Sequence, residues 1–389
     1  MTLALYVHVP FCESRCAYCG FYSGESLQWC SQYPEWVAAE ARLRRAERPG
    51  KGRLTSVYLG GGTPSLLGEA GIGRVLEAAR NEWGVAQDAE VTVEVNPGVP
   101  TDLVALRRLG VNRLSVGVQA LDDGVLASLG RRHTAACATG AVQDARRAGF
   151  PRVSADLLYG VPGLRPGALR DWVYGLSAQG ADHVSAYSLE LHPGTPLAEA
   201  VALGLAEACG SDEEESQWWE LTEALAQEGY EAYEVSNFAW PGARCRHNVA
   251  YWEGGPYLGL GPGAHGYEPA EGMWGTRWWN APSLHRYRES LLAGILPPGG
   301  REILTRDEAL LETLFLAFRR TQPLGLGSVP RRFRLDPVRW AETLARLERH
   351  GFLRPAGAGC WTPTLEAARR ADGLALWIRE LMVSAAGAP

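Results

Sequence analysis

Apolar and β-branched runs alternate with amphipathic segments through the first half of the chain. Six short runs have the alternating or continuously apolar character of strands, and most are followed by segments with helical spacing of apolar residues. A repeated strand–helix–strand order predicts a parallel sheet with right-handed crossovers. Because the pattern holds six units and not eight, it predicts an α/β partial barrel, similar to an incomplete TIM barrel. The predicted strands are 3–9, 55–61, 90–95, 113–119, 152–160 and 183–191, and the clearest predicted helices are 34–47, 69–83 and 135–149.

The pattern changes after residue 200. The following hundred residues are rich in Trp, Gly and Pro and are predicted to be irregular, apart from a helix at 214–229. Beyond a Pro- and Gly-rich boundary at 296–302 come two helical stretches, a predicted hairpin at 351–364 and a last helix at 371–382. That order resembles a small winged-helix-like module. We therefore expect a barrel at 1–200, a connecting region at 201–300 and a helical C-terminal domain at 301–389.

Composition narrows the classes of function. The chain has 389 residues, 46% of them hydrophobic, and a formal net charge of -6, which argues against a protein whose main task is to hold nucleic acid. Eight cysteines are too few for a disulfide framework and favour a reducing compartment. No run approaches the roughly 20 apolar residues of a spanning helix, and the first residues lack the features of a secretory signal. The expected location is the cytoplasm.

Three of the eight cysteines, Cys12, Cys16 and Cys19, fall within eight positions after the first predicted strand. Zinc usually takes four ligands in two short pairs, and the other five cysteines are scattered singly. A four-iron cluster can take three thiolates from one short loop and leave one iron open to an exchangeable ligand. The spacing therefore favours a [4Fe-4S] cluster. Zinc completed by a distant cysteine is the main alternative, and three unligated thiols are a weaker one.

Polar residues stand at or near the ends of three predicted strands, namely Glu94, Gln119 and Asp156. In a parallel barrel the carboxyl ends of the strands form the rim at which ligands bind. The glycine-rich stretch YLGGGTPS follows the second strand, and its glycines would let a ligand approach backbone N–H groups. Each feature alone has a structural explanation, such as a salt bridge or a plain turn. Together they predict a ligand site at the rim.

These motifs resemble the radical S-adenosylmethionine (radical SAM) superfamily. CESRCAYC matches its CxxxCxxC loop, in which the methionyl amine and carboxylate of SAM chelate the open iron. The nearest subgroup is the HemW-type heme chaperones, relatives of the oxygen-independent coproporphyrinogen III dehydrogenase. The resemblance implies a [4Fe-4S] cluster, S-adenosylmethionine and heme as bound groups. The further motifs that carry it, in chain order, are YLGGGTPS, VEVNP, SVGVQ, LGRRHT, DLLYGVPG, CRHNVAYW and YLGLGPGAHG.

The resemblance also gives roles to single residues. Arg131 would serve the SAM carboxylate, with Arg132 as its competitor, while Tyr6 would point toward the cluster and Tyr18 would cover it. Core packing is the alternative role of Tyr6, and a solvated surface position that of Arg131. The residues implied to contact SAM are Gly61, Gly62, Thr63, Glu94, Gln119, Arg131 and Asp156.

His247 lies in the HNxxYW pattern that the resemblance assigns to the heme chaperones and not to the dehydrogenase. Neutral imidazole is a common axial ligand of heme iron, and Tyr251 and Trp252 could form a flat apolar wall. Without the resemblance, a histidine that satisfies buried loop backbone would be preferred. Further candidate ligands, given little weight, are Cys245, His265 and His8.

Two departures separate the chain from the dehydrogenase. Phe21 stands where that enzyme has a fourth cysteine, and the first strand begins almost at Met1, without the enzyme's N-terminal extension. We therefore expect a heme chaperone that transfers heme to an acceptor protein not identified by the sequence. Oxidative decarboxylation of coproporphyrinogen III is the alternative, so enzymatic activity is left open. Nucleic-acid binding by the C-terminal module ranks low, and peripheral membrane contact is left open.

Overall fold

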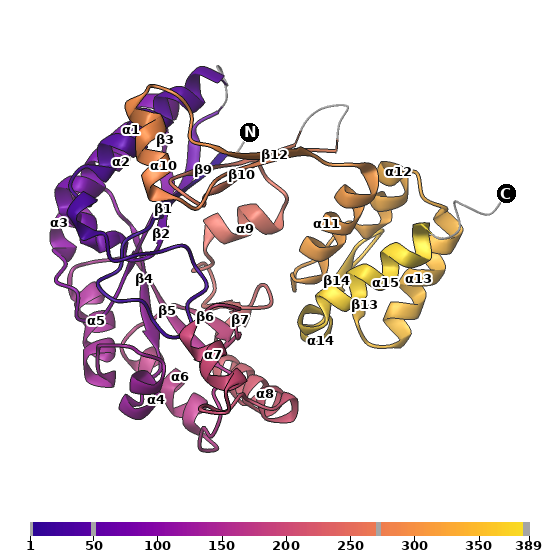
Figure 1. The fold of residues 1–389 in the computed structure, drawn as a ribbon. Helices are drawn as coiled ribbons and strands as arrows, with labels where there is room; N and C mark the ends of the chain where they lie inside the picture. Colours follow the sequence, from indigo (N-terminus) through magenta and orange to yellow (C-terminus); the bar gives the residue numbers. More distant parts are fainter. Residues whose placement is uncertain (1–2, 48–51, 270–273, 384–389) are drawn as a thin grey trace.

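Six parallel strands form the centre of a 12-stranded sheet in the computed structural model, which describes residues 3–47, 52–269 and 274–383. The strand order is β12-β11-β10-β9-β1-β2-β3-β4-β5-β6-β8-β7, and each neighbouring pair among β1–β6 is parallel. The sheet curves into an open crescent with helices along its outer side (Figure 1). This confirms the predicted partial barrel. The six strands are β1 (Leu3–Val9), β2 (Leu54–Gly61), β3 (Val85–Val95), β4 (Arg113–Gln119), β5 (Arg152–Tyr159) and β6 (His183–Ser188).

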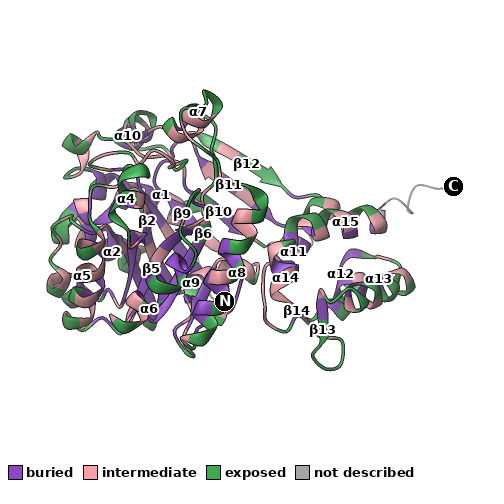
Figure 2. Ribbon diagram, turned by 90° about the horizontal axis from the view of Figure 1, so that it is seen from below, coloured by how far each residue is buried: buried purple, intermediate pink, exposed green. Residues whose placement is uncertain are grey.

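The two faces of these strands differ in chemistry because successive side chains point to opposite sides of a sheet. Leu5 and Val7 of β1 are fully buried in the core that the outer helices cover. Tyr6 and His8, which alternate with them, face the hollow of the crescent, and Tyr6 lies beside Tyr58 of β2 there. The burial colouring in Figure 2 shows the strands as the buried centre of the barrel. The hollow is therefore lined by polar and aromatic groups, while the outer face supplies the packing.

Helices follow most of the strands and several begin with side-chain caps. Asp102, Asp122 and Thr134 each accept a hydrogen bond from a backbone N–H of the helix that they precede. Such caps satisfy N–H groups that have no partner within the helix. The barrel helices are α1 (Tyr33–Glu47), α2 (Gly68–Trp83), α3 (Leu103–Arg108), α4 (Asp123–Ser128), α5 (Ala135–Arg147), α6 (Ala168–Ala178), α7 (Pro196–Ala202) and α8 (Ser211–Gln227).

The segment 201–300 holds more regular structure than its composition indicated, because its glycines permit close strand packing as well as turns. A Cβ atom on Gly259 would lie 2.0 Å from the carbonyl oxygen of His265, and one on Gly266 would lie 2.1 Å from the Trp278 ring. The strands extend both edges of the barrel sheet, whereas β6 ends three residues earlier than expected. The elements are β7 (Glu231–Ala232), β8 (Asn237–Ala239), α9 (Arg246–Trp252), β9 (Tyr257–Leu260), β10 (His265–Glu268), β11 (Thr276–Asn280), α10 (Leu284–Leu292) and β12 (Gly299–Ile303).

The C-terminal module has its own hydrophobic core, which includes Leu310, Phe318, Phe333 and Ile378. It follows β12, and its first helix packs against both its last helix and α9 (Figure 1). Helices, hairpin and last helix occur in the expected order. Among the described residues, no helix combines the length and apolar character needed to cross a bilayer. The elements are α11 (Arg306–Phe318), α12 (Val329–Phe333), α13 (Pro337–Arg349), β13 (Leu353–Pro355), β14 (Trp361–Pro363), α14 (Leu365–Arg369) and α15 (Ala371–Val383).

Candidate cofactor and ligand site

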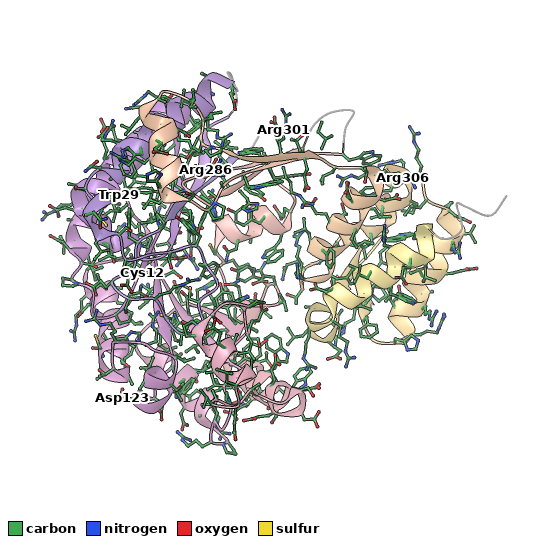
Figure 3. The ribbon with its side chains drawn as sticks, viewed as in Figure 1. Cys12, Trp29, Asp123, Arg286, Arg301 and Arg306 are labelled. Carbon is green, nitrogen blue, oxygen red and sulfur yellow. The ribbon has the colours of Figure 1, made fainter. Side chains whose placement is uncertain are left out.

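The three clustered cysteines lie on the loop that follows β1, where Figure 3 labels Cys12. All three are half-buried free thiols, and the Cys12 N–H donates to the Gly24 carbonyl at 3.0 Å. Within the described residues, no three His, Cys, Asp or Glu side chains are arranged to hold one metal ion.

Two polar side chains reach the thiols, Thr63 from the turn after β2 and Arg131 from the segment after α4. Arg131 donates from Nη1 to Cys16 Sγ at 3.3 Å, and Thr63 donates from Oγ1 to Cys12 Sγ at 3.9 Å. Arg132, its competitor in the sequence, is an exposed side chain 3.9 Å from Glu13. Burial raises the pKa of the Cys12 thiol. Deprotonated thiols at this loop therefore need a positive charge nearby. Arg131 provides one such charge, and the iron ions of a cluster would provide more.

Asn96 links these two side chains and is a residue that sequence reasoning missed. Its Oδ1 accepts from Arg131 Nη2 at 2.7 Å, and its Nδ2 donates to Thr63 Oγ1 at 2.8 Å. A Cβ on Gly117 would lie 2.6 Å from Asn96 Oδ1 and 3.1 Å from Gln119 Nε2, so the missing side chain makes room for both amides. Gln119 has a φ of 67°, a left-handed conformation that is uncommon outside glycine. Thr63, Asn96, Gln119 and Arg131 thus converge at one place on the rim.

The two rim carboxylates are held inside the hollow. Glu94 accepts from the Tyr58 hydroxyl and from the Gly61 N–H, both at 2.9 Å, and Asp156 accepts from Ser115 Oγ at 3.1 Å. Burial, followed by repulsion from Asp156, raises the pKa of Glu94 from 4.5 to about 7. Burial also raises the pKa of Asp156 from 3.8 to about 6. Near neutral pH this pair would gain from a cationic or hydroxyl-bearing ligand.

The glycine-rich turn differs from expectation, because its N–H groups already have partners within the protein. The Gly61 N–H donates to Glu94, the Gly62 N–H to the Val9 carbonyl at 2.8 Å, and the Thr63 N–H to the Phe11 carbonyl at 2.7 Å. A Cβ on Gly61 would lie 2.6 Å from the His8 ring, so this glycine serves close packing. The expectation that these N–H groups face a ligand is therefore wrong for this structure.

The two tyrosines of the site lie in different surroundings. Tyr6 points into the hollow with its hydroxyl 3.1 Å from His8 Nδ1, and its ring centroid lies 6.4 Å from that of His247. Tyr18, on the cysteine loop, packs partly buried against Leu129 and its neighbours. Burial raises the pKa of Tyr18 well above its ordinary value, so the phenol stays neutral.

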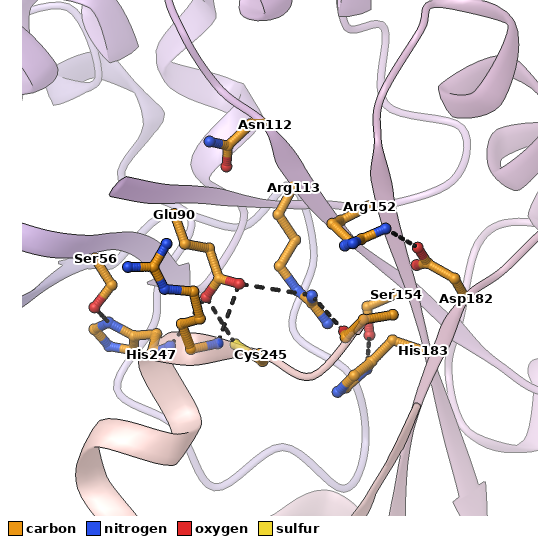
Figure 4. Close-up of polar contacts among 12 residues, drawn as sticks. Ser56, Glu90, Asn112, Arg113, Arg152, Ser154, Asp182, His183, Cys245 and His247 are labelled. Atoms are coloured by element: carbon orange, nitrogen blue, oxygen red, sulfur yellow. Dashed lines mark hydrogen bonds and ion pairs between the residues drawn. The ribbon is translucent and has the colours of Figure 1, made fainter. Parts of the chain in front are cut away.

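A buried polar network anchors the segment that carries His247 (Figure 4). Glu90 accepts from the N–H groups of Arg246 and His247 at 3.1 and 3.0 Å, at the start of α9. It also lies 3.7 Å from the fully buried guanidinium of Arg113, which donates to the Ala243 carbonyl at 3.0 Å. A carboxylate at a helix N-terminus satisfies free N–H groups and complements the helix dipole. This network fixes α9 inside the hollow of the crescent.

His247 itself is buried with both ring nitrogens engaged. Nδ1 lies 2.9 Å from Ser56 Oγ and Nε2 lies 2.9 Å from the Tyr251 hydroxyl. Burial lowers its pKa from 6.5 to about 3, so the imidazole is neutral. Axial ligation by His247 would require it to leave one of these partners. Cys245 is fully buried beside Glu90, and burial raises the pKa of its thiol to about 12, so it is not placed for iron binding.

An aromatic cavity of about 670 Å³ lies between the barrel and the C-terminal module. Its size falls within the roughly 300–1,000 Å³ of small-molecule sites. The cysteine loop, α9, the β9–β10 region and α11–α12 all contribute to its walls, so sequence-distant segments meet there. Its aromatic lining comprises Tyr6, Phe21, Tyr22, Tyr251, Trp252, Tyr257, Tyr267, Trp274 and Phe333. Tyr251 and Trp252 were expected to form an apolar wall, whereas Tyr267, Trp274 and Phe333 were not foreseen because no local pattern joins them to it.

The partial barrel and its three-cysteine loop define a radical SAM protein, and residues 6–172 match the family model of the radical SAM superfamily. The sequence is 40% identical over 330 residues to the heme chaperone HemW of Mycobacterium tuberculosis, covering 83% of each chain. It is 34% identical over 367 residues to the heme chaperone HemW of Synechocystis sp., covering 91% of this chain and 86% of that protein. The chain therefore belongs to the HemW family of radical SAM proteins.

The fold is also similar to that of coproporphyrinogen III oxidase (HemN) from Escherichia coli, with a TM-score of 0.78. That similarity covers 96% of this chain and 89% of HemN at 23% sequence identity. At this identity the likeness supports the architecture, including the C-terminal module, and leaves the activity to be argued from the site.

Proposed function

We propose that this protein binds heme in the aromatic cavity and passes it to an acceptor protein. The observation that carries the proposal is the cavity itself, which places an apolar, aromatic space directly beside the cysteine loop in a member of the HemW family. A porphyrin is flat and largely apolar, and aromatic walls bury such a surface favourably. Residues of both the barrel and the C-terminal module line the cavity, so a ligand in it would contact both.

We further propose that Cys12, Cys16 and Cys19 hold a [4Fe-4S] cluster, with S-adenosylmethionine as an exchangeable ligand. The half-buried thiols beside Arg131 fit such a group, and a cluster bound by three thiolates offers one open iron. Glu94, Asp156 and Gln119 would orient the SAM molecule from the rim. His247 stays a predicted heme ligand that would have to give up a hydrogen bond. The acceptor protein, the cytoplasmic location and any membrane contact also stay predictions.

The test uses anaerobically purified protein in two assays. Titration with hemin should give one heme per chain and a Soret band. Incubation with coproporphyrinogen III, SAM and a reductant should release no protoporphyrinogen, because Phe21 occupies the place of the dehydrogenase's additional cysteine in the resemblance. About four irons per chain are expected before titration, and the triple variant Cys12→Ala, Cys16→Ala, Cys19→Ala should lose them.

The triple variant separates the two parts of the proposal. If the triple variant still binds heme, the sulfur atoms of the three cysteines are not needed to hold the heme, as proposed. Decarboxylated product at catalytic turnover would overturn the chaperone assignment in favour of the dehydrogenase. Stoichiometric zinc in place of iron after anaerobic isolation would contradict the cluster.

A further inference from the structure

The wall of the aromatic cavity carries one imidazole whose ring nitrogens have no hydrogen-bond partner among the described residues. Two of the eight histidines line this cavity, His8 and His265. His8 is buried and engaged at both nitrogens, with Nε2 2.7 Å from the Tyr22 carbonyl oxygen and Nδ1 3.1 Å from the Tyr6 hydroxyl. His265 is exposed to the cavity, and within the described part of the chain its ring makes no hydrogen bond or ion pair.

We propose that His265 supplies the nitrogen that ligates the iron of a metalloporphyrin in the aromatic cavity. This inference rests on the proposed heme binding and assigns the ligand to a residue other than His247. A ring nitrogen lone pair would be donated to the iron, with no change in oxidation state. Neutral imidazole is a common axial ligand of heme iron.

The backbone around His265 is built to hold its ring in place. His265 opens β10 and pairs with Trp279 of β11, on whose ring its own ring stacks at 6.0 Å with an interplanar angle of 23°. Close packing of this strand requires glycine on both sides: Gly266 against the Trp278 ring and Gly259 against the His265 carbonyl. An imidazole oriented by a neighbouring ring and a rigid sheet loses little freedom when it binds a ligand.

The rest of the cavity matches the other parts of a porphyrin. Aromatic rings supply the flat apolar walls, and Arg320 and Arg332 stand on the side formed by the C-terminal module. Arg320 lies 3.3 Å from Glu253, whereas the Arg332 guanidinium lies 4.9 Å from the centroid of the Phe333 ring. Guanidinium groups bind carboxylates such as porphyrin propionates well. Iron, macrocycle and carboxylates would thus each meet a suitable group.

The experiment compares hemin with metal-free protoporphyrin IX in wild type and in His265→Ala, His247→Ala and His350→Ala. His350 is an exposed histidine at the end of α13, outside the cavity, and serves as the matched control. His265→Ala should raise the Kd for hemin roughly tenfold or more, since loss of groups that support a metal ligand already costs about 10–100-fold. It should also change the Soret band, and millimolar imidazole should restore the wild-type spectrum. Affinity for metal-free protoporphyrin should change little.

The outcomes separate the two proposals. Wild-type protein that binds neither porphyrin would overturn the proposed function itself. Hemin binding with an unchanged spectrum in His265→Ala and an altered one in His247→Ala would keep the function and reject His265. Equal loss of both porphyrins in His265→Ala would show that the ring only packs against the macrocycle, which also rejects ligation.

Discussion

At the scale of residues, the inner face of the barrel carries two buried carboxyl groups, Glu94 and Asp156, whose raised pKa values make their protonation depend on pH. Glu94 has a pKa raised to about 7, mainly by burial and then by Asp156. Its carboxylate oxygens nevertheless organise the site, since they receive the Tyr58 hydroxyl and the Gly61 N–H. The folded protein therefore holds a proton on Glu94 at pH values where the unfolded chain has released it. Stability linked to this group is present at low pH and is lost as the pH rises through the folded pKa.

In wild type the free energy of unfolding should fall between pH 6 and pH 8.5, and Glu94→Gln should make this fall smaller. The pKa rise from 4.5 to about 7 corresponds to a loss on the order of 1 kcal/mol over that interval in wild type, and the neutral amide removes this contribution. Urea unfolding at both pH values measures the difference. Glu342→Gln, which changes an exposed carboxylate of α13, is the control and should keep the wild-type fall. An identical fall in Glu94→Gln would show that Glu94 is already ionised in the folded state at pH 6.

The residues of the candidate site differ in how readily the sequence predicts them. The cysteine spacing and the polar residues at strand ends are local signals, and the structure places Cys12, Glu94 and Asp156 at the carboxyl side of the barrel as expected. Asn96 and Tyr58 lie in the motifs VEVNP and YLGGGTPS, but they act through partners 33 to 36 positions away, so the motifs did not indicate their roles. Only their positions in the predicted strands could have pointed to them. Asn96 comes directly after β3, and Tyr58 is one of the alternating residues of β2.

At the scale of elements, α9 is held in the hollow by a carboxylate from the neighbouring sheet. A seven-residue helix is too short to be stable alone, so its position depends on tertiary contacts. Glu90 provides them by accepting from two N–H groups at the helix start and by pairing with buried Arg113. The sequence motif HNVAYW gives no hint of this anchor, because the carboxylate lies more than 150 positions earlier.

Glu90→Gln should destabilise the protein by roughly 3–5 kcal/mol, because it leaves the Arg113 guanidinium buried without its opposite charge. The amide oxygen can still accept from one helix N–H, so the loss tests the charge more than the hydrogen bond. Urea unfolding measures the stability, and amide hydrogen exchange should report faster exchange in α9. Asp88→Asn is the control, since its pair with Arg246 is exposed and should contribute less than about 1 kcal/mol. A change below 1 kcal/mol in Glu90→Gln would show that the charge pair with Arg113 contributes little to holding α9.

The elements after residue 230 show why composition misled the prediction there. Glycine and tryptophan together favour an irregular interpretation, yet Gly266 is needed where β10 lies against the Trp278 ring. Strands β9–β12 continue the barrel sheet beyond β1: β9 pairs with β1, which is far away in the sequence, and β10, β11 and β12 each pair with the strand before them. Strands of four or five residues leave little periodicity to detect, whereas β1–β6 repeat one strand–helix unit.

At the scale of the whole molecule, the ligand cavity belongs to neither the barrel nor the C-terminal module alone. The cysteine loop and α9 form one wall, and α11 and α12 form another. Trp274 stands between the two parts, stacked on Phe333 of the module with ring centroids 5.2 Å apart and an interplanar angle of 15°. A ligand that fills such a cavity contacts both parts and stabilises the folded protein in proportion to its affinity.

Trp274→Ala should therefore weaken porphyrin binding from the side opposite the cysteine loop. Tryptophan is enriched among the few interface residues whose truncation costs about 2 kcal/mol or more, and on that basis the Kd for metal-free protoporphyrin should rise roughly tenfold or more. Fluorescence titration measures this affinity without involving an iron ligand. In wild type, saturating porphyrin should also raise the melting temperature, and the rise should shrink in the variant at the same ligand concentration. Trp219→Ala, which removes a partly exposed tryptophan of α8 outside the cavity, is the matched control and should bind as wild type. Unchanged affinity in Trp274→Ala would mean that the porphyrin contacts the barrel side only, and the C-terminal module would then have no part in holding it.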